Sequence, residues 1–385
     1  MLIQEALKKI FENINLKNSS EFTSIDNAVD KIIAEDIVAV KNLPSFDNSA
    51  LDGYAINFAD RKAPISITDT VFAGDGREIS IKSGECVKIM TGAKMPKGAD
   101  TVVRFEDAII ESGKLIVDER TKQFSAFRHK GEEIKSGDVL FGKGTRLSAT
   151  HVMMLAAQGI SFVKVFCEPK IGIFSSGDEI VEPWQSASED QIYNANAIGM
   201  QALLSKFGFK SSYLGIIKDD LNDTINAINS ADMDVLICSG GASKGEADFM
   251  KTALLSLGFT ELFGYIDARP ARPSKAYVKD SKIVFIMPGN PMSAFLSAFL
   301  LIVPFLLKRP LEATKAYIMQ DLKVKSGREN VVLGRLEEDK FYVTDDNKYG
   351  SGMIMPLVKS NAICLSNFDQ SEFRQNDEVL VYKFS

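Results

Sequence analysis

The sequence predicts a multidomain protein of the α/β plus β class. Its 385 residues exceed the usual length of one domain, and 45% of them are apolar, which is enough for more than one buried core. The apolar pattern changes along the chain, from short alternating runs to a repeat of strand, glycine-bearing loop and helix, and back to short runs. We therefore expect an inserted β-rich module, a three-layer α/β domain and a C-terminal β-barrel-like domain.

Residues 1–14 carry apolar side chains at helical spacing with charges between them. This pattern predicts an amphipathic helix and not the uncharged core of a signal peptide. We expect a second helix from about Ser24, running into a strand-like segment at 37–40. A third helix is expected to follow Ser148, which suits an N-cap, and to end at Gly159.

Two stretches have the short alternating runs of β-structure. Between residues 51 and 140 the runs are separated by Gly, Lys and Asp turns, and they cover residues 65–71, 85–90, 101–105 and 114–119. After residue 309 the same texture returns, at residues 331–336, 340–346, 361–366 and 378–384.

Between residues 170 and 308 strand-like runs alternate with glycine loops and helices. The runs are residues 170–174, 211–217, 234–238 and 282–286. This alternation predicts a mostly parallel, doubly wound sheet, with ligands bound beyond the carboxyl ends of its strands. The apolar stretch 292–307 is shorter than the roughly 20 residues of a membrane span. It predicts a buried helix, with Asn290 as its cap and Pro291 at its first position.

These observations divide the chain into four expected parts. They are an N-terminal body at 1–45 and 141–168, a β-rich module at 46–140, the α/β domain at 169–309 and a C-terminal β-domain at 310–385.

Charge and composition exclude several classes of function. With 45 Lys and Arg against 51 Asp and Glu, the chain has no basic excess to bind a nucleic-acid backbone, and no membrane partner is indicated. Its four cysteines lie far apart and it has only two histidines, so neither a zinc knuckle nor a multi-histidine metal site is expected. Reduced thiols in the cytoplasm are favoured, and a metal ion would need oxygen ligands.

The loops after the α/β strands carry the most specific chemistry. Their glycines let a phosphate approach closely, and backbone amides at helix starts favour anions. Carboxylates beside such a site need a divalent cation between them and the phosphate. Glu179, Asp219 and Asp248 therefore suggest Mg²⁺ bridging a nucleotide or pyrophosphate. Each of them alone could equally be a solvated loop carboxylate or a helix cap.

Cations follow in the same domain. Arg269, Arg272 and Lys275 could bind an oxyanion, which arginine grips with two parallel hydrogen bonds. The alternative is a surface loop stiffened by prolines. Neither a Walker loop nor a Gly-x-Gly-x-x-Gly element is present in the sequence.

Two further candidates lie in the expected β-rich module. Asp52 precedes Gly53 in a turn-rich stretch and would project from a loop, whereas Asp47 and Asn48 are expected to cap local backbone. Thr91 follows a strand, and its hydroxyl and the neighbouring amides could bind an oxyanion, although an ordinary loop is an equal interpretation.

Six segments taken in order resemble the molybdopterin molybdenumtransferase family, which includes MoeA and the gephyrin E-domain. They are residues 46–55, 90–103, 128–138, 174–180, 238–248 and 287–295. The resemblance implies an elongated homodimer with four domains per subunit. It further implies an enzyme that takes adenylylated molybdopterin and molybdate, uses Mg²⁺, releases AMP and forms molybdenum cofactor. Other proteins of that biosynthesis could be partners.

The resemblance also implies roles for individual residues. The catalytic set is Asp52, Thr91, Glu179, Asp219 and Asp248, with Glu179 and Asp248 as metal ligands. The substrate-binding set is Gly240, Gly241, Ser243, Arg269, Arg272, Gly289, Asn290, Pro291 and Ser293. In the family the site forms between subunits, with the elements around Asp52 and Thr91 facing the partner's α/β domain.

Two departures from the family pattern affect these roles. The chain has Arg-Pro-Ala-Arg-Pro at 269–273, where the family usually has Lys-Pro-Gly-Lys-Pro, and Glu133 stands where an aspartate is common. Two other functions stay open: a molybdopterin-binding or scaffolding protein without turnover, and a molybdopterin adenylyltransferase. The second shares only the α/β segment with this chain.

Overall fold

The computed structural model describes residues 1–14, 16, 19–240 and 249–385, which form two compact units. Unit 1 comprises Met1–Asn18 and Glu168–Ser385, and unit 2 is Ser19–Cys167. Unit 1 therefore groups the N-terminal segment with the α/β domain and the C-terminal part of the chain. The finer division into four parts stays a prediction.

The two terminal segments of unit 2, which contain β1, β2, β11, α2 and β12, differ from the expectation in one element. Instead of a helix from about Ser24, the structure has strand β1 (Ser20–Ser24), paired antiparallel with β12 (Phe162–Phe166), and a single 3-10 turn, η1 (Ile25–Asn27). Val163 and Val165 of β12 are buried, so pairing with a distant strand outweighs the weak local helical pattern. The remaining elements here are β2 (Ile37–Val38), β11 (Val139–Phe141) and α2 (Ala149–Ala157), which Ser148 caps as expected.

The rest of unit 2 is the expected β-rich module. Its six-stranded sheet has the order β7-β4-β6-β5-β9-β8. These strands are β4 (Gly53–Ile56), β5 (Ile65–Val71), β6 (Glu85–Ile89), β7 (Thr101–Arg104), β8 (Ile109–Glu111) and β9 (Lys114–Ile116). Alternate side chains of β4 enter two separate apolar clusters, with Ala55 in one and Tyr54 and Ile56 in the other. A short strand β3 (Asn48–Ser49) pairs with β10 (Phe127–Arg128).

Unit 1 contains the α/β sheet, whose order is β16-β13-β17-β21-β20-β18. The strands are β13 (Ile171–Ser176), β16 (Ser212–Ile217), β17 (Val235–Ser239), β18 (Thr260–Phe263), β20 (Lys275–Lys279) and β21 (Lys282–Met287). The first four strands in this order are parallel, and β20 and β18 add an antiparallel edge. The prediction of a mostly parallel sheet is confirmed.

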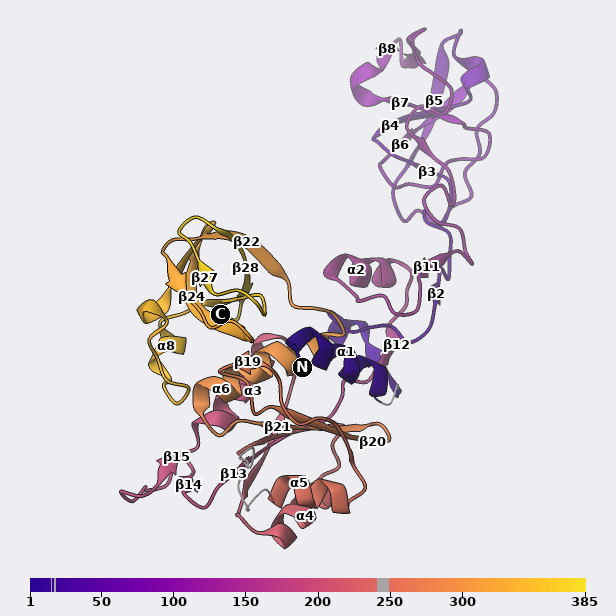
Figure 1. The fold of residues 1–385 in the computed structure, drawn as a ribbon. Coiled ribbons are helices and arrows are strands. Elements are labelled where there is room, and N and C mark those ends of the chain that lie inside the picture. Colours follow the sequence, from indigo (N-terminus) through magenta and orange to yellow (C-terminus); the bar gives the residue numbers. More distant parts are fainter. Residues whose placement is uncertain (15, 17–18, 241–248) are drawn as a thin grey trace. The chain divides into compact units, whose positions relative to one another are not determined.

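Helices cover both faces of this sheet, which gives three layers (Figure 1). In β17, Val235 and Ile237 pack on one side, and Leu236 and Cys238 pack on the other. The first side carries α1 (Ile3–Asn13), α3 (Ala195–Lys206), α6 (Pro291–Ser297), the π-helix η4 (Ala298–Ile302) and α7 (Val303–Leu307). The second side carries α4 (Leu221–Ser230) and α5 (Phe249–Ser256). Across the described ranges, no helix combines the length and apolar character needed to cross a bilayer.

A closed five-stranded barrel follows the α/β domain in unit 1. Its strands pair in the cycle β24–β25–β22–β28–β26–β24. They are β22 (Ala313–Ile318), β24 (Glu329–Glu337), β25 (Lys340–Val343), β26 (Ala362–Leu365) and β28 (Glu378–Lys383). From the α/β domain, β19 (Ala268–Arg269) adds to β24 in parallel, with Arg269 opposite Asn330. This pairing brings one of the predicted arginines against the barrel.

Short elements complete the description. They are η2 (Phe58–Asp60), η3 (Phe105–Asp107), β14 (Ile180–Val181), β15 (Ile192–Tyr193), β23 (Leu322–Lys323), η5 (Thr344–Asn347), α8 (Met355–Val358) and β27 (Glu372–Phe373).

Candidate functional site

The loops after three neighbouring parallel strands meet at the carboxyl edge of the α/β sheet. Gly240, after β17, has φ +101°, and a Cβ there would lie 2.3 Å from the Ser176 carbonyl oxygen at the end of β13. Only glycine permits this approach. A Cβ on Gly289, after β21, would lie 4.0 Å from the Gly240 Cα. Because β13 lies between β16 and β17, this edge is also the point where the strand order reverses, the usual ligand position in open α/β sheets.

Asparagines at the start of α3 join these loops. Nδ2 of Asn196 donates to Ser239 Oγ and to the Gly289 carbonyl, both at 2.7 Å. Its Oδ1 is buried, and no group in the described ranges donates to it. Asn194 is buried and accepts from Ser175 Oγ at 2.8 Å. The sequence analysis does not identify these asparagines, because asparagine at a helix start is equally an ordinary cap.

Carboxylates gather beside the same edge. The Asp219 amide donates to Asp178 Oδ1 at 3.3 Å, and Ser176 Oγ donates to Asp219 Oδ1 at 3.4 Å. Glu179 lies against Gly177, where a Cβ would be 2.7 Å from Glu179 Oε2. Desolvation of the Asp219 carboxyl is the main cause that raises the pKa of Asp219, and the charges of Asp178 and Glu179 add to it. The residue as a whole is exposed. The structure therefore brings the predicted Glu179 and Asp219 together.

The expected metal site includes residues on both sides of the limit of the described ranges. Gly241, Ser243 and Asp248 lie outside the described residues, and with them one of the two predicted metal ligands. In the part of the chain that is described, no group of three or more His, Cys, Asp or Glu side chains has the arrangement of a metal site. The oxygen donors present match the preference of Mg²⁺, and a cation would offset the desolvation and the repulsion by Asp178 and Glu179 that raise the pKa of Asp219.

A basic cavity of about 510 Å³ lies between the α/β domain and the barrel. Arg269 and Pro270 line it from the α/β side, and Lys323, Lys325 and Arg328 line it from the barrel side. Four cationic residues therefore surround one hollow. The sequence analysis predicts only Arg269 among them, because the barrel cations lie more than fifty residues further along the chain in an ordinary polar turn.

Arg328 lines this cavity with a hydrogen-bond donor that is unsatisfied within the described ranges. Its Nε is buried and has no hydrogen-bond partner in the described ranges. Burial, together with the positive charges of Arg269 and Arg272, lowers the pKa of Arg328. An anion in the cavity would satisfy the buried N–H and relieve the repulsion. Arg272 itself is exposed, with its guanidinium 5.6 Å from the centre of the Tyr265 ring, and it does not line the cavity.

The loop before α6 connects the two sides of the cavity. Ser293 is buried, and its hydroxyl donates to the Pro270 carbonyl at 2.7 Å, so it holds the arginine segment in place. Asn290 begins the helix, as expected, but its side chain makes no cap; it donates to Ser351 Oγ at 2.8 Å. The Met292 amide donates to the Ser351 carbonyl at 3.1 Å, and Pro291 occupies the first helical turn. Tertiary contact with the barrel thus replaces the local cap.

In unit 2, Asp52 and Thr91 are hydrogen-bonded to each other. Asp52 Oδ1 accepts from the Thr91 amide at 2.6 Å and from its hydroxyl at 2.7 Å. The hydrogen bond from the Thr91 amide has the larger effect and that from the hydroxyl the smaller, and both lower the pKa of Asp52, which is fully exposed. The Thr91 donors expected to bind an oxyanion are therefore occupied by Asp52. Thr91 positions an ionised carboxylate.

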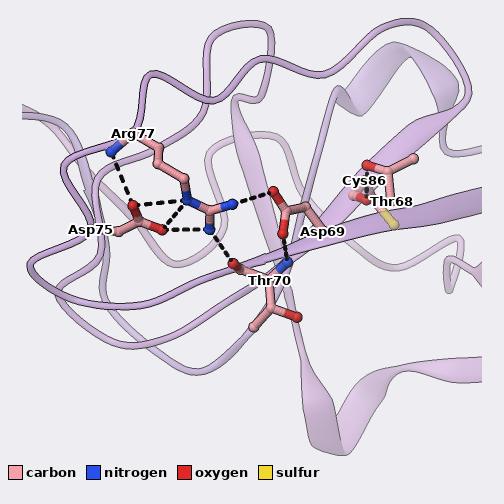
Figure 2. Close-up of polar contacts among 6 residues, drawn as sticks. All are labelled: Thr68, Asp69, Thr70, Asp75, Arg77 and Cys86. Carbon is pink, nitrogen blue, oxygen red and sulfur yellow. Dashed lines mark hydrogen bonds and ion pairs between the residues drawn. The ribbon is translucent and has the colours of Figure 1, made fainter.

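An arginine holds the neighbouring loop. Arg77 contacts Asp75 with Nε and one terminal nitrogen, and donates to Asp69 Oδ2 at 2.9 Å and to the Thr70 carbonyl at 3.0 Å (Figure 2). This loop faces the Thr91 segment, because a Cβ on Gly92 would lie 4.0 Å from the Ala73 Cβ.

Three further residues of the six matching segments, Asp47, Glu133 and Cys238, belong to the protein's own structure. Asp47 Oδ1 accepts from the Lys130 amide at 2.7 Å, so it supports backbone as expected. Glu133 contacts Arg128 at 3.6 Å. Burial raises the pKa of the Cys238 thiol to about 12, so this thiol is neutral and a poor nucleophile.

Models of three related families match most of the chain. The MoeA N-terminal region (domain I and II) matches residues 1–159, a probable molybdopterin binding domain matches 172–308, and the MoeA C-terminal region (domain IV) matches 315–384. Among curated proteins, the chain is 31% identical to a molybdopterin molybdenumtransferase of Haemophilus influenzae, covering 100% of this chain and 99% of the relative. It is 30% identical to one of Staphylococcus epidermidis, covering 78% and 74%.

Solved structures agree with these sequence matches. A molybdopterin biosynthesis MoeA protein from Pyrococcus horikosii superposes with a TM-score of 0.87 at 27% identity, covering 100% of this chain and 99% of that one. A second structure, from Pyrococcus horikoshii OT3, gives a TM-score of 0.78 at 29% identity with the same coverage.

Proposed function

The chain belongs to the MoeA family of molybdopterin molybdenumtransferases, and on that premise we propose that it inserts molybdenum from molybdate into adenylylated molybdopterin with release of AMP. As a member of that family it is a transferase of molybdenum cofactor biosynthesis. The substrates, the order of events and the metal are the proposed part.

One observation carries the proposal, namely the cavity with Arg269, Lys323, Lys325 and Arg328, whose Nε has no hydrogen-bond partner among the described residues. Molybdate is a small dianion, and a cavity of about 510 Å³ with four cationic residues has both the charge and the space for it. The oxyanion is a substrate here, so the cavity needs to bind it reversibly. Ser293 and Asn290 hold the two walls of the cavity in place.

The acidic edge of the α/β sheet supplies the second part of the mechanism. Glycines at 240 and 289 leave room for a phosphate to approach backbone. We propose that Glu179 and Asp248, with Asp219 nearby, hold Mg²⁺, which would neutralise the phosphates and favour departure of AMP. The carboxylates position the cation, the glycines admit the pyrophosphate, and the basic cavity presents molybdate. No covalent nucleophile is required.

Asp52 is proposed to act from unit 2. Its carboxylate is ionised and held by Thr91, with its other oxygen free of any described hydrogen-bond partner. In the family arrangement this residue serves the α/β domain of a second copy, so a homodimer is part of the proposal.

An exposed apolar face of unit 2 supports the dimer. Phe22 and Phe162 lie on the same face of the β1–β12 pair and are 70% and 64% exposed. We expect Phe22→Glu with Phe162→Glu to convert a dimer into monomers in sedimentation experiments. A wild type that sediments as a monomer at micromolar concentration would remove the dimer from the proposal. The cytoplasmic location stays a prediction.

The function is tested by mixing purified protein with adenylylated molybdopterin, Mg²⁺ and molybdate. AMP release that requires molybdate supports the transferase, whereas binding without release supports a scaffolding protein. Arg328→Ala should raise the KM for molybdate about tenfold or more, because a charged hydrogen bond is lost. Arg335→Ala is the matched control, since Arg335 lies on the same barrel but pairs with Glu337 outside the cavity. Equal KM values for the two variants would refute the cavity assignment.

A further inference from the structure

A cluster of three aromatic rings lies on unit 2 and has no part in the mechanism above. Phe124 and Phe127 have ring centroids 5.9 Å apart, and His129 lies 5.2 Å from the first ring and 4.7 Å from the second. Phe124 is 49% exposed, so one apolar ring of the cluster faces solvent.

The backbone of this cluster is strained where the ring is exposed. Phe124 has φ +63° and Ala126 has φ +50°, a left-handed conformation that is unfavourable for residues with a Cβ and rare for bulky ones. Because about half of the Phe124 side chain is exposed, burial of the ring does not compensate this cost in full. Strain of this kind persists where the surrounding structure enforces it, and it occurs preferentially at ligand sites.

The surrounding structure does enforce it. The Phe124 amide donates to the hydroxyl of the buried Thr101 at 3.2 Å, and the Ser125 carbonyl accepts from the Val102 amide at 2.9 Å. The Ala126 carbonyl accepts from the Ala50 amide at 2.8 Å. The rings are therefore held on the sheet and are not the tip of a free loop.

The cluster lies close to the Asp52–Thr91 pair. On one side, Ser49 of strand β3 pairs with Phe127. On the other side, the Ser49 amide donates to the Ala93 carbonyl, and the Ser49 carbonyl accepts from the Gly92 amide. Two strand spacings, roughly 10 Å, therefore separate the aromatic segment from the Thr91 segment.

Two cations flank the rings in sequence. Lys122 precedes Phe124, Lys130 follows His129, and neither forms an ion pair with any described residue. Arg128, in contrast, is paired with Glu132 and Glu133. The three ring planes are tilted by 49° to 74° from one another, so the exposed Phe124 ring offers one flat face and the other two rings support it. A flat aromatic face with unpaired lysines close to it in sequence matches a flat ring that carries a phosphate.

We propose that the exposed Phe124 ring, supported by Phe127 and His129, forms a stacking surface for the fused nitrogen heteroaromatic ring of a phosphorylated ligand, near Asp52. The inference rests on the proposed function, in which both the adenine of AMP and the pterin of molybdopterin are rings of this class. Lys122 and Lys130 bind the phosphate.

The key variant is Phe124→Asn. Asparagine tolerates the left-handed conformation, so this change removes the ring and relieves the strain at once. Phe124→Tyr keeps a ring, and Ile109→Ala removes an apolar side chain of the same module that is 51% exposed. Binding to the full chain is measured by calorimetry with AMP, neopterin monophosphate and inorganic phosphate as separate probes.

We expect Phe124→Asn to weaken the binding of AMP or of neopterin monophosphate about tenfold, the size typical of a lost base–aromatic stack. Phe124→Tyr and Ile109→Ala should stay within about twofold of the wild type, and inorganic phosphate should bind all four proteins alike. The probe that loses affinity identifies adenine or pterin. The thermal midpoint of Phe124→Asn should equal or exceed that of the wild type, which a purely structural ring would not allow.

Three results would overturn the proposal. They are unchanged binding of both ring probes, a loss of affinity accompanied by a lower thermal midpoint, and a change in dimer dissociation in place of ligand affinity, which would assign the rings to a second copy. Failure of the proposed function is seen separately, as absence of molybdate-dependent AMP release by the wild type. If release persists with an unchanged KM in Phe124→Asn, only the stacking surface is refuted.

Discussion

Asp52 and Asp219 are both carboxylates on loops at the edge of a sheet, yet their surroundings move their pKa values in opposite directions. Two hydrogen bonds from Thr91 lower the pKa of Asp52. Desolvation and the neighbouring charges of Asp178 and Glu179 raise the pKa of Asp219. Hydrogen bonds therefore favour the ionised form of Asp52, whereas the surroundings of Asp219 favour a bound proton or a cation, despite one long hydrogen bond from Ser176. The same residue type therefore serves two purposes, and four experiments test this contrast.

The largest effect is expected at Asp219. Asp219→Asn should lower Mg²⁺-dependent AMP release roughly a hundredfold, because a charge that favours the cation is lost. Asp223→Asn, in the first turn of α4, is the matched control and should leave the rate unchanged. Rates are measured over a Mg²⁺ titration. An Asp219→Asn enzyme with normal rates at low Mg²⁺ would show that this carboxylate has no role near the metal.

The next effect concerns the position of Asp52. Thr91→Val removes the hydroxyl bond but keeps the amide bond, so the carboxylate loses one of its two donors. We expect the rate to fall about tenfold at unchanged folding, and Thr91→Ser to restore it. Single-turnover AMP release and circular dichroism make the comparison. If valine and serine at this position behave alike, the hydroxyl does not position Asp52.

The pH dependence should separate the two carboxylates. The pKa of Asp219 is raised, so below it a proton competes with Mg²⁺, and half-saturation should require up to about tenfold more Mg²⁺ per pH unit. Asp52 stays ionised throughout this range. Asp219→Asn should abolish the pH dependence of half-saturation, and an unchanged profile in this variant would assign it to another group.

The same shifts predict stability. The pKa of Asp219 is raised in the folded state. Its contribution to the free energy of unfolding is therefore present at acidic pH and is lost as the pH rises through that pKa. Without Mg²⁺, Asp219→Asn should therefore melt at a higher temperature than the wild type at neutral pH. The contribution of Asp52 to the free energy of unfolding has the opposite pH dependence, because it is lost only as the pH falls through its lowered pKa. Thermal melts at several pH values measure both.

The smallest effect is expected at Ser293, which acts through Pro270. Ser293→Ala should raise the KM for molybdate only about two- to threefold, because one neutral hydrogen bond that positions the Arg269 wall is lost. Ser297→Ala, on the same helix and also buried, is the control; its hydroxyl pairs with Ser274. A larger effect at Ser297 would show that helix packing, and not the Pro270 bond, controls the cavity.

The periodic parts of this fold were accessible from the sequence. Strands such as β17 and β21 and the helix after Pro291 have apolar patterns and end signals that depend only on neighbouring residues. The glycines at 240 and 289 could also be identified from their loops, although the close approach of Gly240 to the Ser176 carbonyl joins two strands. Glu179 and Asp219 could be paired by prediction, because carboxyl ends of parallel strands necessarily share one edge.

What the tertiary structure decided is everything that joins distant segments. The strand at 20–24 forms because β12 pairs with it, and Asn290 bonds Ser351 instead of its own helix, since a partner sixty-one residues away is in reach only after folding. The basic cavity arises in the same way, from Arg269 on one domain and Arg328 on the next. Local pattern encodes the elements and the side chains they present. The selectivity of an anion site depends on which charges are brought together in space, and no local pattern contains that information.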